Sequence, residues 1–253
     1  MKRYILLIFF AVCLVSIGGI FLFGSFRSKK SQTVEIVRKF EKDSAFVQDN
    51  LSDLPLMLYE NKAGTKDYFV ILISGDGGWR GFIDQVAKKM SSKGISVVGL
   101  NLVGYLDKEK SPSQIASDIH RIINNFSHSW KKQKVLIGGY SFGGEIIPFF
   151  FNQLNTEDQD KIDKIFFIAI SSLADFKVSP IYYYNPKKSK PVLPEIQKIN
   201  DEKFIFFCDN TNESICKHLP ARNGYKVIQL NYNHLFLGHY KEVCDIIAKN
   251  VVE

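Results

Sequence analysis

The feature that most constrains the fold is a serine placed between two pairs of glycines, directly after a short apolar run. Residues 134–144 read Lys-Val-Leu-Ile-Gly-Gly-Tyr-Ser-Phe-Gly-Gly, and the part from Val135 to Gly138 predicts a buried strand. The residues from Glu145 to Leu154 predict a helix. A strand, a Gly-x-Ser-x-Gly turn and a helix form the context of a nucleophile elbow. Ser141 is therefore the candidate nucleophile, and the alternative is a glycine-rich turn with a helix-capping serine.

Around this stretch, apolar runs alternate with segments of helical periodicity. This alternation predicts a mostly parallel central sheet with helices on both faces, the arrangement of the α/β-hydrolase fold. We expect one such domain over residues 54–253, with an early strand at 54–59 and a small lid-like insertion within the irregular stretch 173–200. The predicted strands are Tyr68–Ser74, Ser96–Asn101, Lys164–Ser171, Lys203–Asp209 and Lys226–Asn231, and the predicted helices are Phe82–Lys93, Pro112–Phe126 and His239–Asn250.

The first thirty residues differ from the rest in composition. Tyr4–Phe26 is an uncharged apolar run long enough to span a bilayer, preceded by Lys2 and Arg3. We expect residues 1–30 to be an uncleaved signal anchor, with a cleaved signal peptide as the alternative, and residues 31–53 to be a tether. The formal net charge is +7, and the five basic residues of this leader account for all but +2 of it. Nucleic-acid binding therefore has little support in the charge of the remaining chain.

A serine nucleophile needs a base and an orienting acid. In α/β-hydrolases the chain order is serine, acid, histidine, with the histidine after the last strand. His234 fits this position, whereas the remaining histidines come too early or begin the final helix. For the acid, Asp209 at a strand end, Glu213 four residues later and Asp175 after the preceding strand all stay open. The histidines that fit worse are His120, His128, His218 and His239.

Two further sets of residues belong to the expected site. The oxyanion hole needs two backbone N–H groups, one from Phe142 and the other from Gly75 or Asp76 in a glycine-rich loop. Cys208 and Cys216 flank both acid candidates, Asp209 and Glu213. We expect a Cys208–Cys216 disulfide, which requires an oxidising compartment, with two reduced thiols as the alternative. The sequence has neither a Walker lysine nor a dinucleotide fingerprint, and we expect no cofactor and no metal.

These motifs resemble a known family. Ile-Ser-Gly-Asp-Gly-Gly-Trp at 73–79, Gly-Tyr-Ser-Phe-Gly-Gly-Glu at 139–145 and Asn-Glu-Ser-Ile-Cys at 212–216 are similar to the bacterial virulence protein VirJ and the matching domain of AcvB. The resemblance runs from Leu54 to the C-terminus. It implies an α/β-hydrolase of the periplasm, with Ser141 as nucleophile and His234 as base. The family's Asp-Ser-x-Cys corresponds here to a segment that begins with Glu213, which favours Glu213 over Asp209 as the acid.

The resemblance also implies a substrate. AcvB-type members are described as hydrolases of lysyl-phosphatidylglycerol, and VirJ is associated with type IV secretion. Asp76 and Glu145 are candidates to receive a cationic aminoacyl group, and Tyr183 in the insertion suits a membrane interface. The leading interpretation is a membrane-anchored periplasmic serine hydrolase acting on an ester of a lipid. The alternatives are a general carboxylesterase or thioesterase, and a non-catalytic module that binds secretion-system proteins.

Overall fold

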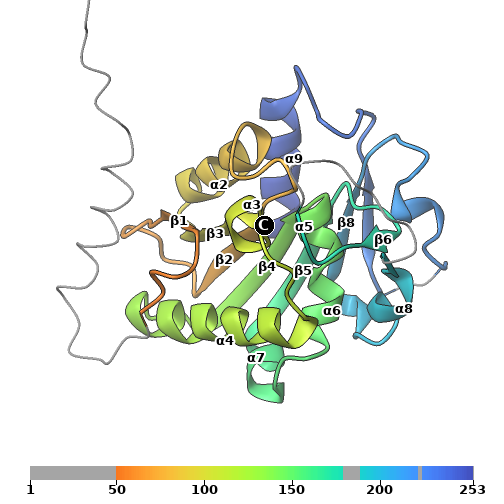
Figure 1. Cartoon of the computed structure of the whole chain (residues 1–253). Helices are drawn as coiled ribbons and strands as arrows, with labels where there is room; N and C mark the ends of the chain where they lie inside the picture. Colours follow the sequence, from red (N-terminus) through yellow and green to blue (C-terminus); the bar gives the residue numbers. More distant parts are fainter. Residues whose placement is uncertain (1–49, 179–188, 222–223, 253) are drawn as a thin grey trace, which may run out of the picture. The chain divides into compact units, whose positions relative to one another are not determined.

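A seven-stranded sheet forms the centre of the computed structural model, which describes residues 50–178, 189–221 and 224–252 (Figure 1). The strand order is β1-β3-β2-β4-β5-β8-β9, and every pair is parallel except β1 with β3. This confirms the predicted mostly parallel sheet. The strands are β1 Leu56–Tyr59, β2 Tyr68–Ile73, β3 Val97–Leu100, β4 Lys134–Tyr140, β5 Ile162–Ile168, β8 Phe204–Cys208 and β9 Lys226–Gln229.

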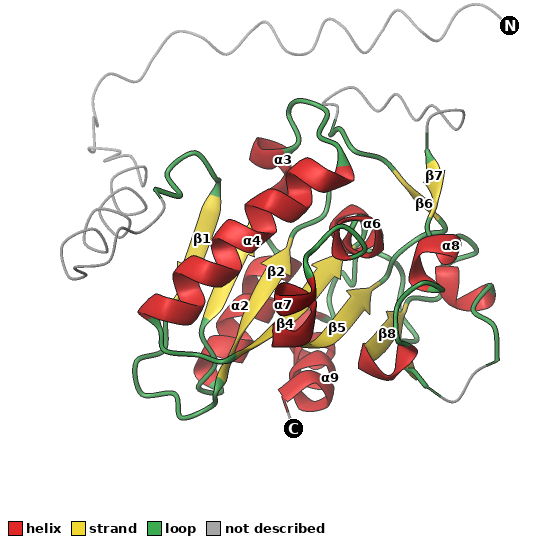
Figure 2. Cartoon of the chain, turned by 90° about the horizontal axis from the view of Figure 1, so that it is seen from below, coloured by secondary structure: helices red, strands yellow, loops and turns green. Residues whose placement is uncertain are grey.

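Helices cover both faces of the sheet. Helices α2 and α9 lie on one face, and α4, α6 and α7 lie on the other, as the two perpendicular views show (Figures 1 and 2). One helix was predicted from Glu145 to Leu154, but the structure has two short helices here: α5, which begins earlier, at Phe142, and α6, which has Pro148 in its first turn. The bounds are α2 Phe82–Ser92, α4 Pro112–Ser129, α5 Phe142–Glu145, α6 Ile147–Phe151, α7 Thr156–Lys161 and α9 Tyr240–Val252.

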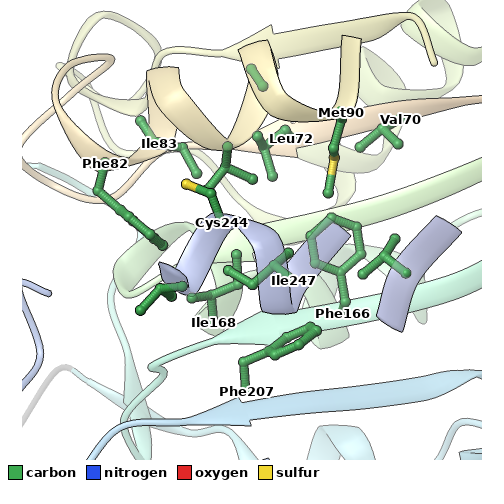
Figure 3. Packing of buried hydrophobic residues seen from close by; sticks show 14 of the residues in the cluster. Val70, Leu72, Phe82, Ile83, Met90, Phe166, Ile168, Phe207, Cys244 and Ile247 are labelled. Atoms are coloured by element: carbon green, nitrogen blue, oxygen red, sulfur yellow. The ribbon is translucent and has the colours of Figure 1, made fainter. Parts of the chain in front are cut away.

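The core between the sheet, α2 and α9 follows from the apolar spacing of these segments. On α2 the buried side chains recur every three or four residues, so they form one face that turns toward the sheet. Met90 and Ile247, from the two helices, approach Val70 and Phe166 of the strands (Figure 3). Phe82 extends this core toward the carboxyl end of the sheet, where its ring lies 5.2 Å from that of Tyr140. The core therefore supports the end of β4 that carries Ser141.

The strand order places a switch point at β2. The chain leaves β2 for β3 on one side and later adds β4 on the other side. In open α/β sheets, ligands bind outside the carboxyl ends of the strands at such a point. The loop after β2 begins at Ser74, and the turn after β4 holds Ser141. The topology thus brings these two segments together at the place where a site is expected.

Several segments have more regular structure than the sequence indicated. Residues 156–160, which lie outside the helices and strands predicted above, belong to helix α7, whose first turn is capped by the side chain of Asn155 accepting a hydrogen bond from the Asp158 backbone N–H. A short helix, α3 (Leu102–Tyr105), follows β3 in a stretch where no helix was predicted. Within the insertion, β6 (Leu173–Ala174) pairs with β7 (Lys190–Pro191), and α8 (Leu193–Ile196) follows. The polar composition of α7 concealed it, and the other elements have only two to four residues, which is too short to show a periodic apolar pattern.

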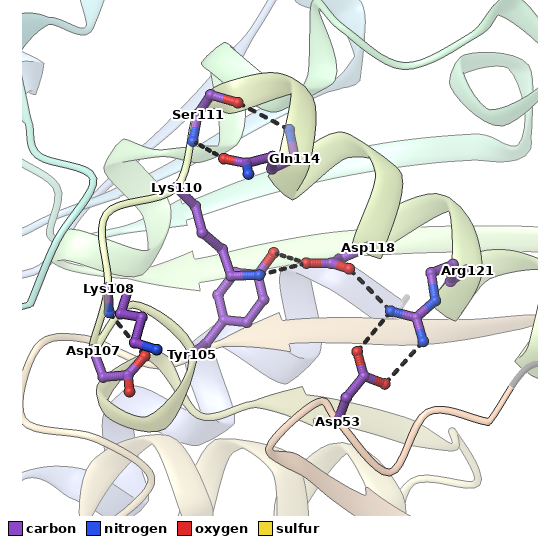
Figure 4. Close-up of polar contacts among 9 residues, drawn as sticks. All are labelled: Asp53, Tyr105, Asp107, Lys108, Lys110, Ser111, Gln114, Asp118 and Arg121. Carbon is purple, nitrogen blue, oxygen red and sulfur yellow. Dashed lines mark hydrogen bonds and ion pairs between the residues drawn. The ribbon is translucent and has the colours of Figure 1, made fainter.

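A polar network fixes the beginning of the described chain to α4. The Arg121 guanidinium donates hydrogen bonds to both carboxylate oxygens of Asp53, at 2.8 and 2.9 Å, and also to Asp118 (Figure 4). The buried Tyr105 hydroxyl and the Lys110 ammonium donate to the other oxygen of Asp118, at 2.7 and 3.0 Å. The Lys110 backbone N–H donates to the carbonyl of residue 176, so the network also holds the base of the insertion.

The predicted membrane segment Tyr4–Phe26 and the tether before residue 50 lie outside the described residues. Within the described ranges, no helix has both the length and the apolar composition needed to cross a bilayer.

Candidate active site

Ser141 occupies the sharp turn between β4 and α5. Its φ of 52° and ψ of −128° are uncommon for a residue with a side chain, and such strain is typical of a nucleophile elbow. The glycines on both sides are required by space. A Cβ on Gly139 would lie 2.4 Å from the backbone nitrogen of Gly144, and a Cβ on Gly143 would lie 2.2 Å from the carbonyl oxygen of Ser74. The Gly-x-Ser-x-Gly motif therefore has the structural role that the sequence indicated.

Three side chains form a hydrogen-bonded series at this turn. Ser141 Oγ lies 2.8 Å from Nε2 of His234, and Nδ1 of His234 lies 2.9 Å from Oδ2 of Asp209. Ser141 follows β4, Asp209 follows β8, and His234 lies in the loop between β9 and α9. Because parallel strands end at the same edge of the sheet, three distant parts of the sequence meet there. The arrangement is that of a serine, a base and an orienting acid.

The loop that carries His234 is held from its backbone. The hydroxyl of Tyr140 donates a hydrogen bond of 2.8 Å to the carbonyl oxygen of His234, and the two rings stack with their centroids 5.6 Å apart. Two residues later, Phe236 is fully buried against Phe82, with ring centroids 4.8 Å apart. The imidazole is therefore positioned by the elbow itself and by the core. The sequence analysis did not identify Tyr140, because it occupies an x position of Gly-x-Ser-x-Gly and nothing in the motif indicates a hydrogen bond to a residue 94 positions later.

The charges of the acid and the base support each other. Burial alone would raise the pKa of Asp209, but the hydrogen bond and charge of His234, with a further hydrogen bond from Thr211, hold it below its usual value. The hydrogen bond from Asp209 raises the pKa of His234, although burial opposes this shift. Asp209 is thus ionised at neutral pH, and the imidazole beside it is a stronger base than a free histidine.

The preference for Glu213 as the acid is corrected by this geometry. Glu213 is exposed, and within the described part of the chain its carboxylate has no hydrogen bond to His234, whereas Asp209 is 3% exposed and contacts Nδ1 directly. Asp175, the third candidate, accepts a hydrogen bond of 2.9 Å from the Ser189 hydroxyl. Both Glu213 and Asp175 still line the adjacent pocket. The position of Glu213 in the family's Asp-Ser-x-Cys pattern therefore predicted the wrong acid, because the loop turns the Glu213 side chain toward solvent.

A disulfide joins Cys208 and Cys216, the pairing named from the sequence, with the Cα atoms 6.0 Å apart. It closes the loop that contains Asp209 and Glu213. Ser214 in the same loop pairs with Ser171 as an isolated bridge, and the Ile215 backbone N–H donates to the carbonyl of Ile170. These contacts fix the loop against the end of β5. The remaining described cysteine, Cys244, is buried in the core.

The residues expected to form an oxyanion hole lie around Ser141. A Cβ on Gly75 would lie 3.5 Å from the Cβ of Ser141, so the backbone after β2 runs directly beside the nucleophile. Phe142 begins α5, and both Phe142 and Asp76 line the pocket. The two segments chosen from the sequence are therefore adjacent to the serine. Their N–H groups remain the candidates for stabilising a developing oxyanion.

A pocket of about 590 Å³ opens beside Ser141 and His234. Its lining carries five carboxylates against one lysine, so it favours a ligand with positive charge. Tyr183, which was expected to contribute to substrate binding, lies outside the described residues. The lining residues are Asp76, Ser141, Phe142, Glu145, Ala169, Ile170, Ser171, Ser172, Leu173, Asp175, Lys177, Val178, Asp209, Thr211, Glu213, Ser214, His218 and His234.

Glu145 is the most unusual carboxylate of this pocket. Its residue is only 7% exposed, and Oε1 accepts a hydrogen bond of 3.0 Å from the backbone N–H of Ser171. Burial raises the pKa of Glu145 to about 7, and the hydrogen bonds from Ser171 and the charge of His234 oppose that rise. A buried carboxyl group with a pKa near 7 is stabilised strongly by a cationic partner, because a nearby positive charge favours its ionised form.

We expect the Glu145→Gln variant to gain stability relative to the unaltered protein as pH rises. The pKa of Glu145 moves from its usual 4.5 up to about 7, so the folded state binds this proton more tightly than the unfolded state does. The associated stability is complete below pH 4.5 and is lost as pH rises through 7. The unfolding free energy of Glu145→Gln minus that of the unaltered protein should therefore increase by about 3 kcal/mol between pH 4.5 and pH 8.

Urea unfolding at a series of pH values measures this difference. Glu213→Gln, which makes the same carboxylate-to-amide change at an exposed side chain of the same pocket, is the matched control. A flat difference for Glu145→Gln would contradict the assignment of Glu145 as a buried group that is costly to ionise.

Comparison with protein families gives a match over most of the chain. Residues 67–253 match the family described as "Bacterial virulence protein (VirJ)". The matched range contains Ser141, Asp209 and His234. No curated protein matches the sequence.

Solved structures show similarity of fold at low sequence identity. Est1E from Butyrivibrio proteoclasticus gives a TM-score of 0.52 at 11% identity, covering 78% of this chain and 92% of that one. XC6422 from Xanthomonas campestris, described as an α/β serine hydrolase without lid, gives 0.52 at 10% identity, with coverages of 78% and 86%. The monoacylglycerol lipase of Paleococcus ferrophilus gives 0.51 at 12% identity, with coverages of 78% and 97%. Together with the sheet topology, these similarities confirm the predicted α/β-hydrolase fold.

Proposed function

Because this chain belongs to the VirJ family of bacterial virulence proteins, we propose that it is a serine hydrolase that cleaves an ester bond. The observation that carries the proposal is the series Ser141–His234–Asp209, with contacts of 2.8 and 2.9 Å, at the edge of an open pocket. A serine, a histidine and a buried carboxylate in this order are what nucleophilic attack on an ester requires.

The reaction follows from the geometry in two steps. His234 Nε2 takes the proton of Ser141 while Oγ attacks the ester carbonyl carbon, and the resulting oxyanion is stabilised by the backbone N–H group of Phe142 and by that of Gly75 or Asp76. His234 then returns the proton to the leaving alcohol as the carbon–oxygen bond breaks. In the second step His234 removes a proton from water, which attacks the acyl group on Ser141 and frees the serine. Asp209 holds the ring orientation throughout and stabilises the protonated imidazole.

The pocket charge supports an ester with a cationic acyl group. Asp76 and Glu145 both lie in the lining next to Ser141, and Glu145 is buried where an ammonium group would relieve the cost of its ionisation. We propose an aminoacylated phospholipid as the substrate class, with lysyl-phosphatidylglycerol as the specific substrate. Attack on the aminoacyl ester would place the lysyl group on Ser141 and release phosphatidylglycerol. Water would then release lysine.

The location that we propose is the periplasm, at the inner membrane. Support comes from the apolar run Tyr4–Phe26, which has the length of a membrane anchor, and from the Cys208–Cys216 disulfide, which needs an oxidising environment. A lipid substrate and a membrane anchor are consistent with each other, because the anchor keeps the domain near its substrate.

The proposal is tested by incubating the purified protein with lysyl-phosphatidylglycerol in mixed micelles and measuring free lysine. We expect lysine release that depends on Ser141. Glu145→Gln should raise the KM for the lysyl ester by about tenfold, since one charge-assisted contact to the ammonium would be lost. The same substitution should leave cleavage of a short neutral acyl ester within twofold.

Two results would change the assignment. Rapid cleavage of simple acyl esters or thioesters without lysine release would identify a general carboxylesterase or thioesterase. Absence of any cleavage, together with failure to react with a fluorophosphonate probe, would identify a non-catalytic binding module that uses the hydrolase fold as a scaffold.

A further inference from the structure

Two leucines next to His234 are exposed to water. Leu235 is 55% exposed and Leu237 is 61% exposed, the highest values among the large apolar side chains of the described residues. A single exposed leucine is common on protein surfaces and needs no explanation. These two occur together, on the loop that carries the base of the active site. Their position, and the way the loop is held, suggest a role for them.

The loop is rigid because its central residue is fixed in the core. Phe236, between the two leucines, is fully buried, and its ring lies 4.8 Å from that of Phe82. The backbone turns sharply here, with a φ of 52° at Phe236 and 82° at Gly238. The Phe236 N–H donates to the carbonyl of Asn233, and its own carbonyl accepts from His239. With Phe236 buried, the flanking leucines are directed outward and cannot retract into the core.

The leucines lie one and three residues after His234, which lines the pocket. Leu235 directly follows His234, which lines the pocket and contacts Ser141. The carbonyl of His234 is held by Tyr140, so the loop cannot move away from the elbow without breaking that hydrogen bond. A surface that covers these leucines would therefore contact the loop that holds His234 beside Ser141.

We propose that Leu235 and Leu237 insert into the interfacial region of a lipid bilayer and so hold the pocket entrance against the membrane. This inference rests on the proposed function, in which the substrate is a lipid ester. Two leucines provide far less area than the roughly 800 Å² per partner of a stable protein interface. A bilayer, by contrast, accepts single apolar side chains, because the burial of each one is favourable by itself.

The length of the chain before the described domain allows this contact. The apolar run Tyr4–Phe26 has the length of a membrane span, and 23 residues separate it from Asn50, the first described residue. Fully extended, a linker of that length reaches about 80 Å at most. The domain would thus stay close to the bilayer, while the leucines would supply the orientation that a linker alone does not give.

A direct test uses tryptophan fluorescence of the full-length protein in phosphatidylglycerol vesicles that contain brominated lipid. Leu237→Trp should show quenching beyond that of the unaltered protein, because the new indole would lie among the acyl chains. The matched control is Val227→Trp on strand β9, where the replaced valine is 48% exposed and stands in the first half of the strand, before the carboxyl edge of the sheet at which His234 lies. Equal quenching of the two variants, or no additional quenching of Leu237→Trp, would overturn the inference.

A kinetic test separates membrane contact from catalysis. The double variant Leu235→Ser, Leu237→Ser should cleave lipid ester in vesicles at least about tenfold more slowly. This factor corresponds to only part of the free energy that is gained when two leucine side chains are buried. Its cleavage of a soluble short ester should stay within twofold of the unaltered protein, which also shows that it folds. Unchanged cleavage in vesicles would refute the inference.

The two proposals fail in different ways. If the unaltered protein cleaves neither lipid nor soluble ester, the proposed function fails, while the fluorescence test still reports on membrane contact. If the double variant instead changes the oligomeric state in solution and Leu237→Trp is not quenched, the leucines form a protein interface and the membrane inference is overturned.

Discussion

Replacement of Ser141 by alanine is expected to abolish ester hydrolysis, with a loss of about a million-fold in kcat, and to leave the fold unchanged. Ser141 Oγ contacts Nε2 of His234 at 2.8 Å and is the atom that would form the covalent intermediate. His234→Ala should reach a similar loss, because members of a catalytic triad act as a unit. Hydrolysis of a small activated ester gives the measurement, together with labelling by a fluorophosphonate probe.

The matched control for these variants is Ser172→Ala, which removes a hydroxyl that lines the same pocket outside the serine–histidine–aspartate series. It should retain activity within a few-fold. Circular dichroism and thermal unfolding would verify that Ser141→Ala and His234→Ala remain folded. Either variant keeping most of its activity would rule out the hydrolase mechanism described above.

The fold could be predicted from the sequence because each central strand is an apolar run with a clear end. Residues 69–73 and 165–168 are buried without interruption, so their composition is continuous in Ile, Leu, Val and Phe. Helix α7 had no such signal. Its residues are Thr-Glu-Asp-Gln-Asp-Lys, and it is recognised only by the capping contact of Asn155. Short polar helices at the surface depend on such local contacts, which composition does not reveal.

The site could be predicted to the extent that chain order determines it. Ser141 follows from the glycines that its turn requires, and His234 follows from its place after the last strand. The acid could not be determined, because Asp209 and Glu213 are four residues apart in one loop and either side chain is long enough to approach a histidine. The fold decides between them. Asp209 directly follows β8 and stays buried, whereas the disulfide and the Ser171–Ser214 bridge hold the loop so that Glu213 faces solvent.

Other contacts of the site involve positions that carry no sequence signature. The Tyr140 hydroxyl holds the carbonyl of His234, and the Ser171 backbone N–H donates to Glu145. Each contact joins groups from separate loops or involves the backbone. No spacing rule identifies such partners, because the three-dimensional approach of the strands creates them.

Asp209→Asn is expected to lower kcat by about ten-thousandfold, the size of effect produced when the orienting acid of a triad loses its charge. Asparagine keeps the shape of Asp209 but has no negative charge to stabilise the imidazolium, and its amide NH2 can donate to Nδ1 and so hold the ring in the wrong tautomer. Glu213→Gln is the matched control, since it makes the same chemical change in a carboxylate of the same loop and pocket. It should change kcat by less than about threefold.

The pH profile gives a second measurement that a purely structural defect would not reproduce. Asp209 raises the pKa of His234, and the base must be neutral to accept the proton of Ser141. In the unaltered enzyme, kcat/KM should therefore rise with pH through an inflection above the usual histidine value of 6.5. In Asp209→Asn the inflection should move to lower pH, because the hydrogen bond and charge that raise this pKa are removed. A larger loss in Glu213→Gln than in Asp209→Asn, or an inflection that shifts only in Glu213→Gln, would reassign the acid to Glu213.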